Sequence, residues 1–404
     1  MSFHTLFKYY FYLVALLIAS VQLIDTVGFG YRLYSTDFIK QQCPDYLAFM
    51  SAAHIVKDGN IKDLYSEAVQ RSYQRELPRR DYDCQFLPFM YLPISVLLFL
   101  PFSYLPYHVS YVLAGFYSVI AFIFGLFILF RGSKYLPLLI LVSLSSLSLK
   151  YSVMLVHPAP FIFLILASVF KLILTKRDFA AGLVASLLMI RPHLYFFGLP
   201  LLAVSSGNKK EYVTGCLIGT SGLVVANILM YGRDFMVGMM SMMRLVGGAE
   251  TRLFEHNAYF SLQPVLSELV APNVPMYLYV RGMALILLFV LALYFLAKNR
   301  DKMPIKIAFS VSLVLLLMFS YHVTAADFLL ILLPIYILFV HFSEKIGPIY
   351  QVYLLFMLVY LLANVLVFLN TDISSSRFGL LNALFLMILL AAPVVYETKS
   401  KKPS

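Results

Sequence analysis

The chain has 404 residues, of which 61% are apolar and only 13% are charged, with a formal net charge of +11. Soluble domains carry about 25% charged and about 45–50% apolar residues, so an ordinary cytosolic enzyme, a disordered protein and a coiled coil are excluded. Roughly 20 apolar residues span a bilayer, and the chain is long enough to cross many times. We expect an all-α polytopic membrane protein that forms one integral membrane domain over residues 1–404.

The Lys and Arg residues lie in short loops between apolar runs, and no basic patch is interleaved with aromatic residues on a polar face. Such a distribution fixes the orientation of a membrane protein, and it predicts no binding of nucleic acid. Lys8 precedes the first apolar run, but no small-residue cleavage site ends that run. We therefore expect a retained signal anchor rather than a signal peptide that is removed.

Apolar runs alternate with short polar connections along the chain, and two long polar stretches, 31–85 and 232–274, interrupt them. No repeat of 20–50 residues is visible. The apolar runs are 9–30, 88–106, 108–130, 135–156, 158–175, 179–190, 193–205, 212–231, 275–297, 303–323, 325–342, 348–369 and 378–396.

The short-loop charges orient these runs, because Lys and Arg accumulate on the cytoplasmic side. If 88–106 were a full crossing, Arg131 and Lys134 would lie on the wrong side. That run is short and contains four prolines, so we interpret it as a re-entrant or interfacial element, which is tolerated where protein or a water-filled cavity covers it. All basic clusters then fall inside. They are Arg131/Lys134, Lys176/Arg177, Lys209/Lys210, Lys298/Arg300/Lys302 and the C-terminal lysines.

The runs 179–190 and 193–205 are each too short to span a bilayer, and they form a predicted hairpin with both ends cytoplasmic. Its tip is Arg191-Pro192-His193. About 12 transmembrane helices result, with both termini cytoplasmic and the stretches 31–85 and 232–274 as extracytoplasmic loops. This organisation predicts a multi-pass protein of the cell membrane.

The first outer loop has helical spacing of apolar residues over 45–56 and again over 61–77, with Gly59-Asn60 as a turn between them. We expect two amphipathic helices that lie on the membrane surface. Cys43 and Cys84 flank this loop. A disulfide between them is permitted outside the cytoplasm, and two free thiols are the equal alternative.

Several ionisable side chains gather on the outer side of this topology, where such groups are costly and mark functional sites. One acid near several cations suits a lipid phosphate, and Arg is the preferred bidentate phosphate ligand. Structural alternatives exist: a helix-terminal acid for Asp45, an ion pair with Asp327 for Arg191, and capping or packing roles for the others. The candidates are Asp45, Lys150, His157, Arg191, His193, His322 and Asp327.

Four stretches together resemble the polyprenyl-phosphate-mannose-dependent mannosyltransferases, glycosyltransferase family 87. They are Asp45 to His54 with Gly59 and Asp63-Leu64-Tyr65, then Phe89 to Pro93 with Leu97 to Pro101, then Ala181 to His193, and Tyr321 to Leu330. The resemblance implies a GT-C fold, with Asp45 as the catalytic acid residue of the family. The resemblance also includes Tyr91 and, as a weaker element, His256-Asn257. Departures are Tyr91-Leu92-Pro93 for Tyr-Pro-Pro, Arg191-Pro192 for Lys-Pro and Val156-His157 for Gly-Gln.

The resemblance implies that a hexose moves from a polyprenyl phosphate to a glycolipid or glycan acceptor with inversion at the anomeric carbon. Mannose is the hexose that the resemblance favours. The phosphate is already a good leaving group, so a base for the acceptor hydroxyl and cations for the developing charge suffice. Asp45 would be the base, and the substrate-binding residues would be Arg191, His193, His322, His157, Lys150, Asp327, Tyr91, His256 and Asn257. We expect no cofactor and no metal, and we interpret the methionines 236–243 as a membrane-hugging helix.

Two other functions remain open at this level. A transporter or flippase of lipid-linked sugars would predict internal pseudo-symmetry and paired broken helices, and the sequence shows one broken hairpin without a counterpart. A non-catalytic subunit that scaffolds an envelope-glycan complex would tolerate the substitution Asp45→Asn, whereas an enzyme would lose turnover.

Overall fold

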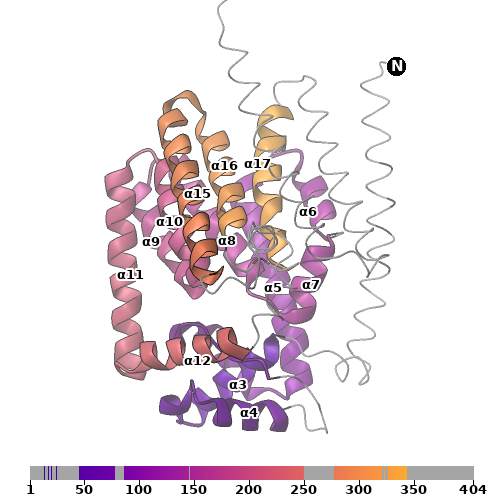
Figure 1. Ribbon diagram of the computed structural model, residues 1–404. Coiled ribbons are helices and arrows are strands. Elements are labelled where there is room, and N and C mark those ends of the chain that lie inside the picture. The colour runs from indigo at the N-terminus through magenta and orange to yellow at the C-terminus, as the bar shows by residue number, and fades with distance from the viewer. Residues whose placement is uncertain are drawn as a thin grey trace, which may run out of the picture.

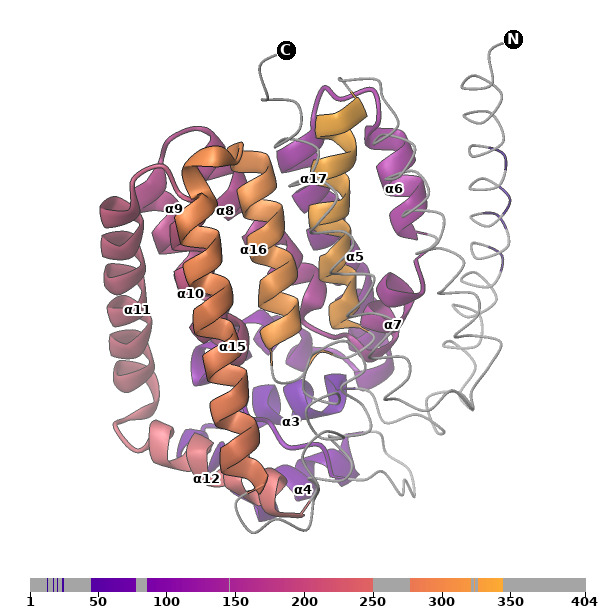
Figure 2. The same cartoon turned by 45° about the horizontal axis from the view of Figure 1, so that its top comes forward.

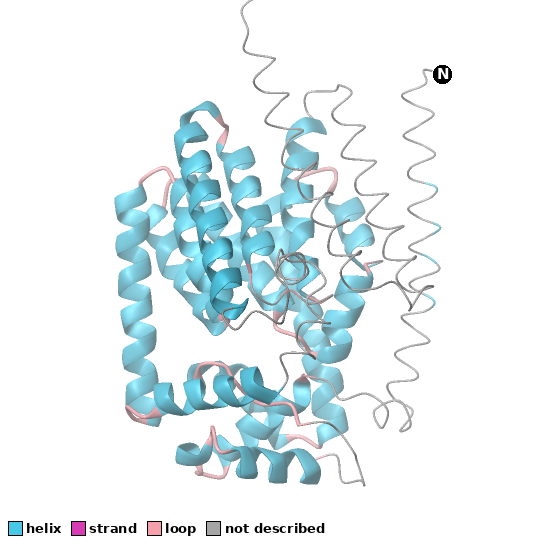
Figure 3. Cartoon of the chain, viewed as in Figure 1, coloured by secondary structure: helices cyan, strands magenta, loops and turns pink. Residues whose placement is uncertain are grey.

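The computed structural model describes residues 45–77, 86–249 and 277–343, with gaps at 145, 321–322 and 324–325, and four isolated residues before 45. Within these ranges every regular element is a helix (Figure 3). The helices form an upright bundle, and α3, α4 and α12 lie across one end of it (Figure 1).

The polar stretch expected as the first outer loop contains α3 (Tyr46–Lys57), the short turn η1 (Ile61–Asp63) and α4 (Glu67–Glu76). Gly59 has a φ of +81°, a conformation that glycine adopts without steric cost, and this confirms the predicted turn. The surface position expected for the first helix is wrong, because the first eight residues of α3 are all buried. The helices α4, η2 and η3 pack against it, and the rings of Tyr107 and Tyr111 from α5 lie against Tyr46.

The run 88–106 forms no membrane-spanning helix. It forms two short 3-10 turns, η2 (Pro93–Leu98) and η3 (Leu100–Tyr104), which pack against α3. Both turns carry proline in their first two positions, where the missing N–H group has no helical partner to lose. The prediction that this run forms no transmembrane helix is confirmed, and its re-entrant or interfacial position in the membrane stays a prediction.

A long helix, α5 (Tyr107–Phe130), then leads to a broken pair, α6 (Leu136–Leu144) and α7 (Leu147–Leu155), and to α8 (Ala159–Leu174). The axes of α6 and α7 differ by 62°. The Ser146 side chain accepts a hydrogen bond from the Leu149 N–H and so caps α7. Serine favours such N-cap positions, which explains why the apolar run 135–156 is not one continuous helix.

The predicted hairpin is present as α9 (Asp178–Ala185), η4 (Ser186–Ile190) and α10 (Pro192–Ser205), with Arg191 at its tip. The next helix, α11 (Lys209–Tyr231), packs closely along α9. A Cβ atom at Gly182 would overlap the Tyr212 carbonyl oxygen, and one at Gly215 would overlap the Phe179 carbonyl oxygen. Small residues let apolar helices approach this closely where no hydrophobic force acts between them.

The remaining described helices are α12 (Phe235–Ala249), α15 (Tyr277–Asn299), η5 (Arg300–Lys302), α16 (Ile305–Phe319), η6 (Asp327–Ile331) and α17 (Leu332–Ser343). The helices α16 and α17 form the centre of the main hydrophobic core. α12 lies across the bundle end beside α3 and α4, as both views show (Figures 1 and 2).

Three described helices are long and apolar enough to cross a membrane, and the bent pair α6–α7 adds a fourth. Large apolar side chains on α5, α11 and α15 are exposed, as a lipid-facing surface requires. The chain is thus a membrane protein of helices. The expected count of about 12 spans includes runs before residue 45 and after residue 343, which lie outside the described residues, as do Cys43 and Cys84.

The basic connections share one end of the bundle. The links α5–α6, α8–α9, α10–α11 and α15–α16 all lie opposite α3, α4 and α12 (Figure 2). They carry Arg131/Lys134, Lys176/Arg177, Lys209/Lys210 and Lys298/Arg300/Lys302. The described helices therefore have the relative arrangement that the charge pattern predicts.

Candidate active site

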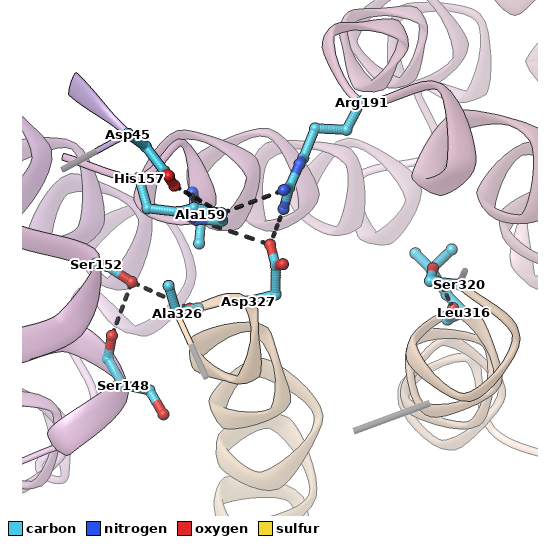
Figure 4. A network of polar contacts seen from close by, with 10 residues as sticks. All are labelled: Asp45, Ser148, Ser152, His157, Ala159, Arg191, Leu316, Ser320, Ala326 and Asp327. Atoms are coloured by element: carbon cyan, nitrogen blue, oxygen red, sulfur yellow. Dashed lines mark hydrogen bonds and ion pairs between the residues drawn. The ribbon is translucent and has the colours of Figure 1, made fainter. Parts of the chain in front are cut away.

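Four ionisable side chains from four separate elements meet between the bundle and α3 (Figure 4). Asp45 immediately precedes α3, and His157 lies between α7 and α8. Arg191 is the hairpin tip, and Asp327 opens η6. The site is therefore built from residues 282 positions apart in the chain, and only the fold brings them together.

His157 is the centre of this cluster. Its Nε2 atom lies 3.9 Å from an Asp45 carboxylate oxygen and 3.1 Å from the Nη2 atom of Arg191. Its Nδ1 atom lies 3.8 Å from Asp327 and 3.3 Å from the Ala159 N–H, which donates to it. Arg191 also donates directly to Asp327. The ion pair expected as the structural alternative for Arg191 is thus present.

The four side chains differ in exposure. The side chains of His157, Arg191 and Asp327 are between 2% and 5% exposed, whereas that of Asp45 is 37% exposed. Asp45 makes no capping hydrogen bond to its own helix, so its carboxylate is turned to the cluster. It is the member of the cluster that a molecule from outside can reach.

Burial raises the pKa of Asp45 to about 6, and the positive charge of Arg191 opposes this shift. The Asp45 side chain is 37% exposed, and contact with solvent limits how far burial can raise its pKa. A carboxylate with a pKa near neutrality is a better proton acceptor than an ordinary surface Asp, since its ionised form still predominates at pH 7 and its basicity is higher.

Tyr91 lies just before η2 and faces the same cluster. Burial raises the pKa of its phenol, with opposing effects of Arg191 and a further upward effect of Asp45. The phenol therefore stays protonated and available as a hydrogen-bond donor. Its ring centre lies 4.8 Å from that of Phe49 on α3.

The turn that presents His157 is strained. Val156 ends α7 with φ 51° and ψ 45°, the left-handed region that β-branched residues rarely occupy. Its side chain is fully buried against the aromatic cluster around Tyr46 and Phe49. Ser152 on α7 donates to the carbonyl of Ala326, the residue before Asp327. This hydrogen bond ties the start of η6 to α7. Such strain persists only where the surrounding structure fixes it, and functional sites are where it concentrates.

Helix N-termini converge on the cluster. α3 begins one residue after Asp45, α8 begins two residues after His157, and α10 begins one residue after Arg191. The N-terminal end of a helix carries a partial positive charge and favours anions. Together with Arg191, these ends make the region a suitable environment for a phosphate group.

The structure brings together five of the predicted site residues: Asp45, Tyr91, His157, Arg191 and Asp327. His193 lies in the first turn of α10 with its Nε2 atom buried, and Lys150 lies on α7, about two turns before His157. Three predictions, His322, His256 and Asn257, lie outside the described residues.

Sequence reasoning missed the polar side chains that hold the Tyr91 segment. Asn227, inside the apolar helix α11, is fully buried and accepts from the Ile94 N–H at 2.8 Å. A polar residue within an apolar run is a signal that could have found it. Among the described residues, no group of three or more His, Cys, Asp or Glu side chains is arranged to hold a metal ion.

Comparison with known families gives one result. The sequence pattern of glycosyltransferase family 87 matches residues 89–320, more than half of the chain. No curated protein and no solved structure matches the chain. The matched range contains Tyr91, His157 and Arg191, and the chain belongs to glycosyltransferase family 87.

Proposed function

Taking membership of glycosyltransferase family 87 as the premise, we propose that the chain transfers a hexose from a polyprenyl phosphate to a hydroxyl of a glycolipid or glycan. Mannose is the hexose to which the sequence resemblance points. The observation that carries the proposal is one reachable carboxylate, Asp45, beside a buried arginine, Arg191. Transfer from a lipid phosphate needs a base and a positive charge, and these two residues supply them.

Asp45 takes the role of general base. It accepts the proton of the acceptor hydroxyl while the acceptor oxygen bonds to the anomeric carbon and the bond from that carbon to the phosphate oxygen breaks. The leaving phosphate gains one negative charge as Asp45 loses one, so the total charge of the site stays constant through the step. Constant charge removes the cost of building up net negative charge in a poorly hydrated site.

Arg191 supplies the positive charge for the leaving phosphate. The contact with Asp327 uses one of the five guanidinium N–H groups. This contact and the 3.1 Å approach of Nη2 to the His157 ring fix the orientation of the side chain. Tyr91, protonated and next to Arg191, adds a neutral donor. Fixed donors directed at developing charge are the largest single contribution in many enzymes.

The exposures support inversion. The double displacement of retaining glycosidases uses a second carboxylate as a nucleophile, about 5–5.5 Å from the first. Asp327, the other carboxylate of the cluster, is 2% exposed and paired with Arg191, so it is not available to attack the sugar. A single displacement by the acceptor, with Asp45 as base, is the reaction that this arrangement favours.

The polyprenyl chain of the donor lies in the bilayer, beside the helix bundle. A polyprenyl chain is apolar, and α11 and α15 expose apolar side chains to the bilayer. The cluster includes Asp45, which immediately precedes α3, and α3 lies at the bundle end opposite the basic connections (Figure 2). The positive-inside rule therefore assigns the cluster to the extracytoplasmic side. We place both termini in the cytoplasm and the protein in the cell membrane.

The test is reconstitution of the purified chain in liposomes with crude membrane lipid and labelled mannosyl-phosphoprenol, followed by mass analysis of the products. We expect a labelled glycolipid or glycan from the lipid donor and none from a nucleotide sugar. Transfer from the nucleotide sugar, or no transfer from any of several lipid-phosphate hexoses, would refute the proposal and favour transport of lipid-linked sugars.

A further inference from the structure

The segment that carries Tyr91 has no regular secondary structure over residues 86–92. Its backbone N–H and C=O groups therefore need partners from elsewhere. Side chains of other elements supply them at every second residue. The hydrogen-bonded backbone positions are Leu87, Phe89 and Tyr91, followed by Ile94 at the start of η2.

Two glutamines of α4 hold the beginning of the segment. Gln74 donates to the Leu87 carbonyl at 2.6 Å and accepts from the Leu87 N–H at 3.1 Å. Gln70, fully buried, accepts from the Phe89 N–H at 2.9 Å. The spacing of four residues places both glutamines on one face of the helix. This face of α4 therefore holds the backbone of the segment at Leu87 and Phe89.

Tyr65 holds the residue that faces the site. Its hydroxyl donates to the Tyr91 carbonyl at 2.7 Å. Its ring is stacked on Phe89, with ring centres 6.2 Å apart, and α12 approaches so closely at Gly238 that a Cβ atom there would lie 2.9 Å from the Tyr65 ring. The ring is thus fixed by packing, and the hydroxyl has little freedom to leave the Tyr91 carbonyl.

We propose that Tyr65 is a positioning residue for the transfer reaction. By its hydrogen bond to the Tyr91 backbone, Tyr65 sets the distance of the Tyr91 phenol from Arg191 and Asp45. This inference rests on the proposed function, because it assigns the Tyr91 phenol a part in that reaction. Tyr65 itself touches neither of the charged groups, and it acts only through Tyr91.

The substitution Tyr65→Phe tests this inference, since it removes the hydroxyl and keeps the ring packing. Misplacement of a catalytic group by about 1 Å can cost about 100-fold in rate, and we expect Tyr65→Phe to lower kcat by roughly 10-fold with a nearly unchanged thermal midpoint. The matched control is Tyr73→Phe, because Tyr73 lies on α4 and its hydroxyl donates to Asp58, outside the cluster. The control should keep wild-type kcat.

A double variant separates positioning from a general structural role. If Tyr65 acts through Tyr91, the loss in Tyr65→Phe/Tyr91→Phe equals the loss in Tyr91→Phe alone. Additive losses, or wild-type kcat in either single variant, would overturn the inference.

A readout without activity keeps the inference separate from the proposed function. With 3-fluorotyrosine incorporated at position 91, the ¹⁹F resonance should shift on Tyr65→Phe and not on Tyr73→Phe. An unmoved resonance would overturn the inference even if the enzyme transfers mannose. If the wild-type protein transfers nothing while the resonance shifts, the proposed function fails and the link between Tyr65 and Tyr91 stands.

Discussion

At the scale of single residues, Asp45 is expected to trade stability for activity. Its pKa is about 6 in the folded protein against an ordinary value of 3.8 for an Asp side chain, so the folded state binds the proton more tightly than the unfolded state. Stability therefore falls as pH rises from about 4 to 6 and does not recover above 6. Wild-type transfer should rise over the range around pH 6, as Asp45 becomes ionised.

The substitution Asp45→Asn removes this ionisation. We expect the variant to lose transfer and to have a higher thermal midpoint than the wild type at pH 7, with the difference disappearing below pH 4. Thermal unfolding in detergent at both pH values measures it. A lower midpoint of the variant at pH 7 would contradict the raised pKa of Asp45.

Val156 offers a second test at this scale. A left-handed conformation costs a residue with a Cβ atom about 1–2 kcal/mol, and glycine avoids that cost. Both Val156→Gly and Val156→Ala lose the buried side chain, but we expect the glycine variant to be more stable by about 1 kcal/mol. Denaturation of the two variants decides this, and an alanine variant that is the more stable of the two would exclude the left-handed turn before His157.

At the scale of elements, the contact between α9 and α11 holds the hairpin that presents Arg191. Gly215 of α11 has no room for a side chain, whereas Gly222 of the same helix has open space around its Cα atom. Gly215→Leu should separate the helices, lower the thermal midpoint and reduce transfer, because overpacking costs typically 1–3 kcal/mol or more. Gly222→Leu is the matched control and should match the wild type. Equal midpoints for the two variants would contradict this packing.

The same scale shows what the sequence can predict. Proline content and the charge pattern identified the non-crossing run before α5 and the hairpin with Arg191 at its tip, because both signals are local. The burial of α3 depends on contacts with distant segments, such as Tyr111 against Tyr46. Local helical spacing does not contain that information.

The site follows the same division. Ionisable residues in or beside apolar runs pointed to Asp45, His157, Arg191 and Asp327, because their cost in a membrane demands a reason. The hydrogen bonds of Tyr65, Gln70 and Gln74 to the Tyr91 segment could not be predicted, since these residues lie in a polar stretch of the chain in which Tyr and Gln are ordinary.

At the scale of the whole molecule, the orientation can be tested directly. Lys62 is exposed beside α3 and Lys209 is exposed at the opposite end of the bundle. In a chain with its three cysteines replaced, we introduce Lys62→Cys or Lys209→Cys. A membrane-impermeant maleimide should label position 62 in intact right-side-out vesicles and position 209 only after permeabilisation. The reverse pattern would place the cluster on the cytoplasmic side.

The central claim is that Asp45 acts as the base in transfer from a lipid-phosphate hexose. The direct measurement compares donor binding and single-turnover transfer for Asp45→Asn and for Asp58→Asn, which removes an exposed carboxylate at the other end of α3. We predict that Asp45→Asn binds mannosyl-phosphoprenol like the wild type but transfers at least roughly 1,000-fold more slowly, within the range of one general base, while Asp58→Asn is unaffected. Transfer by Asp45→Asn at the wild-type rate would contradict the account.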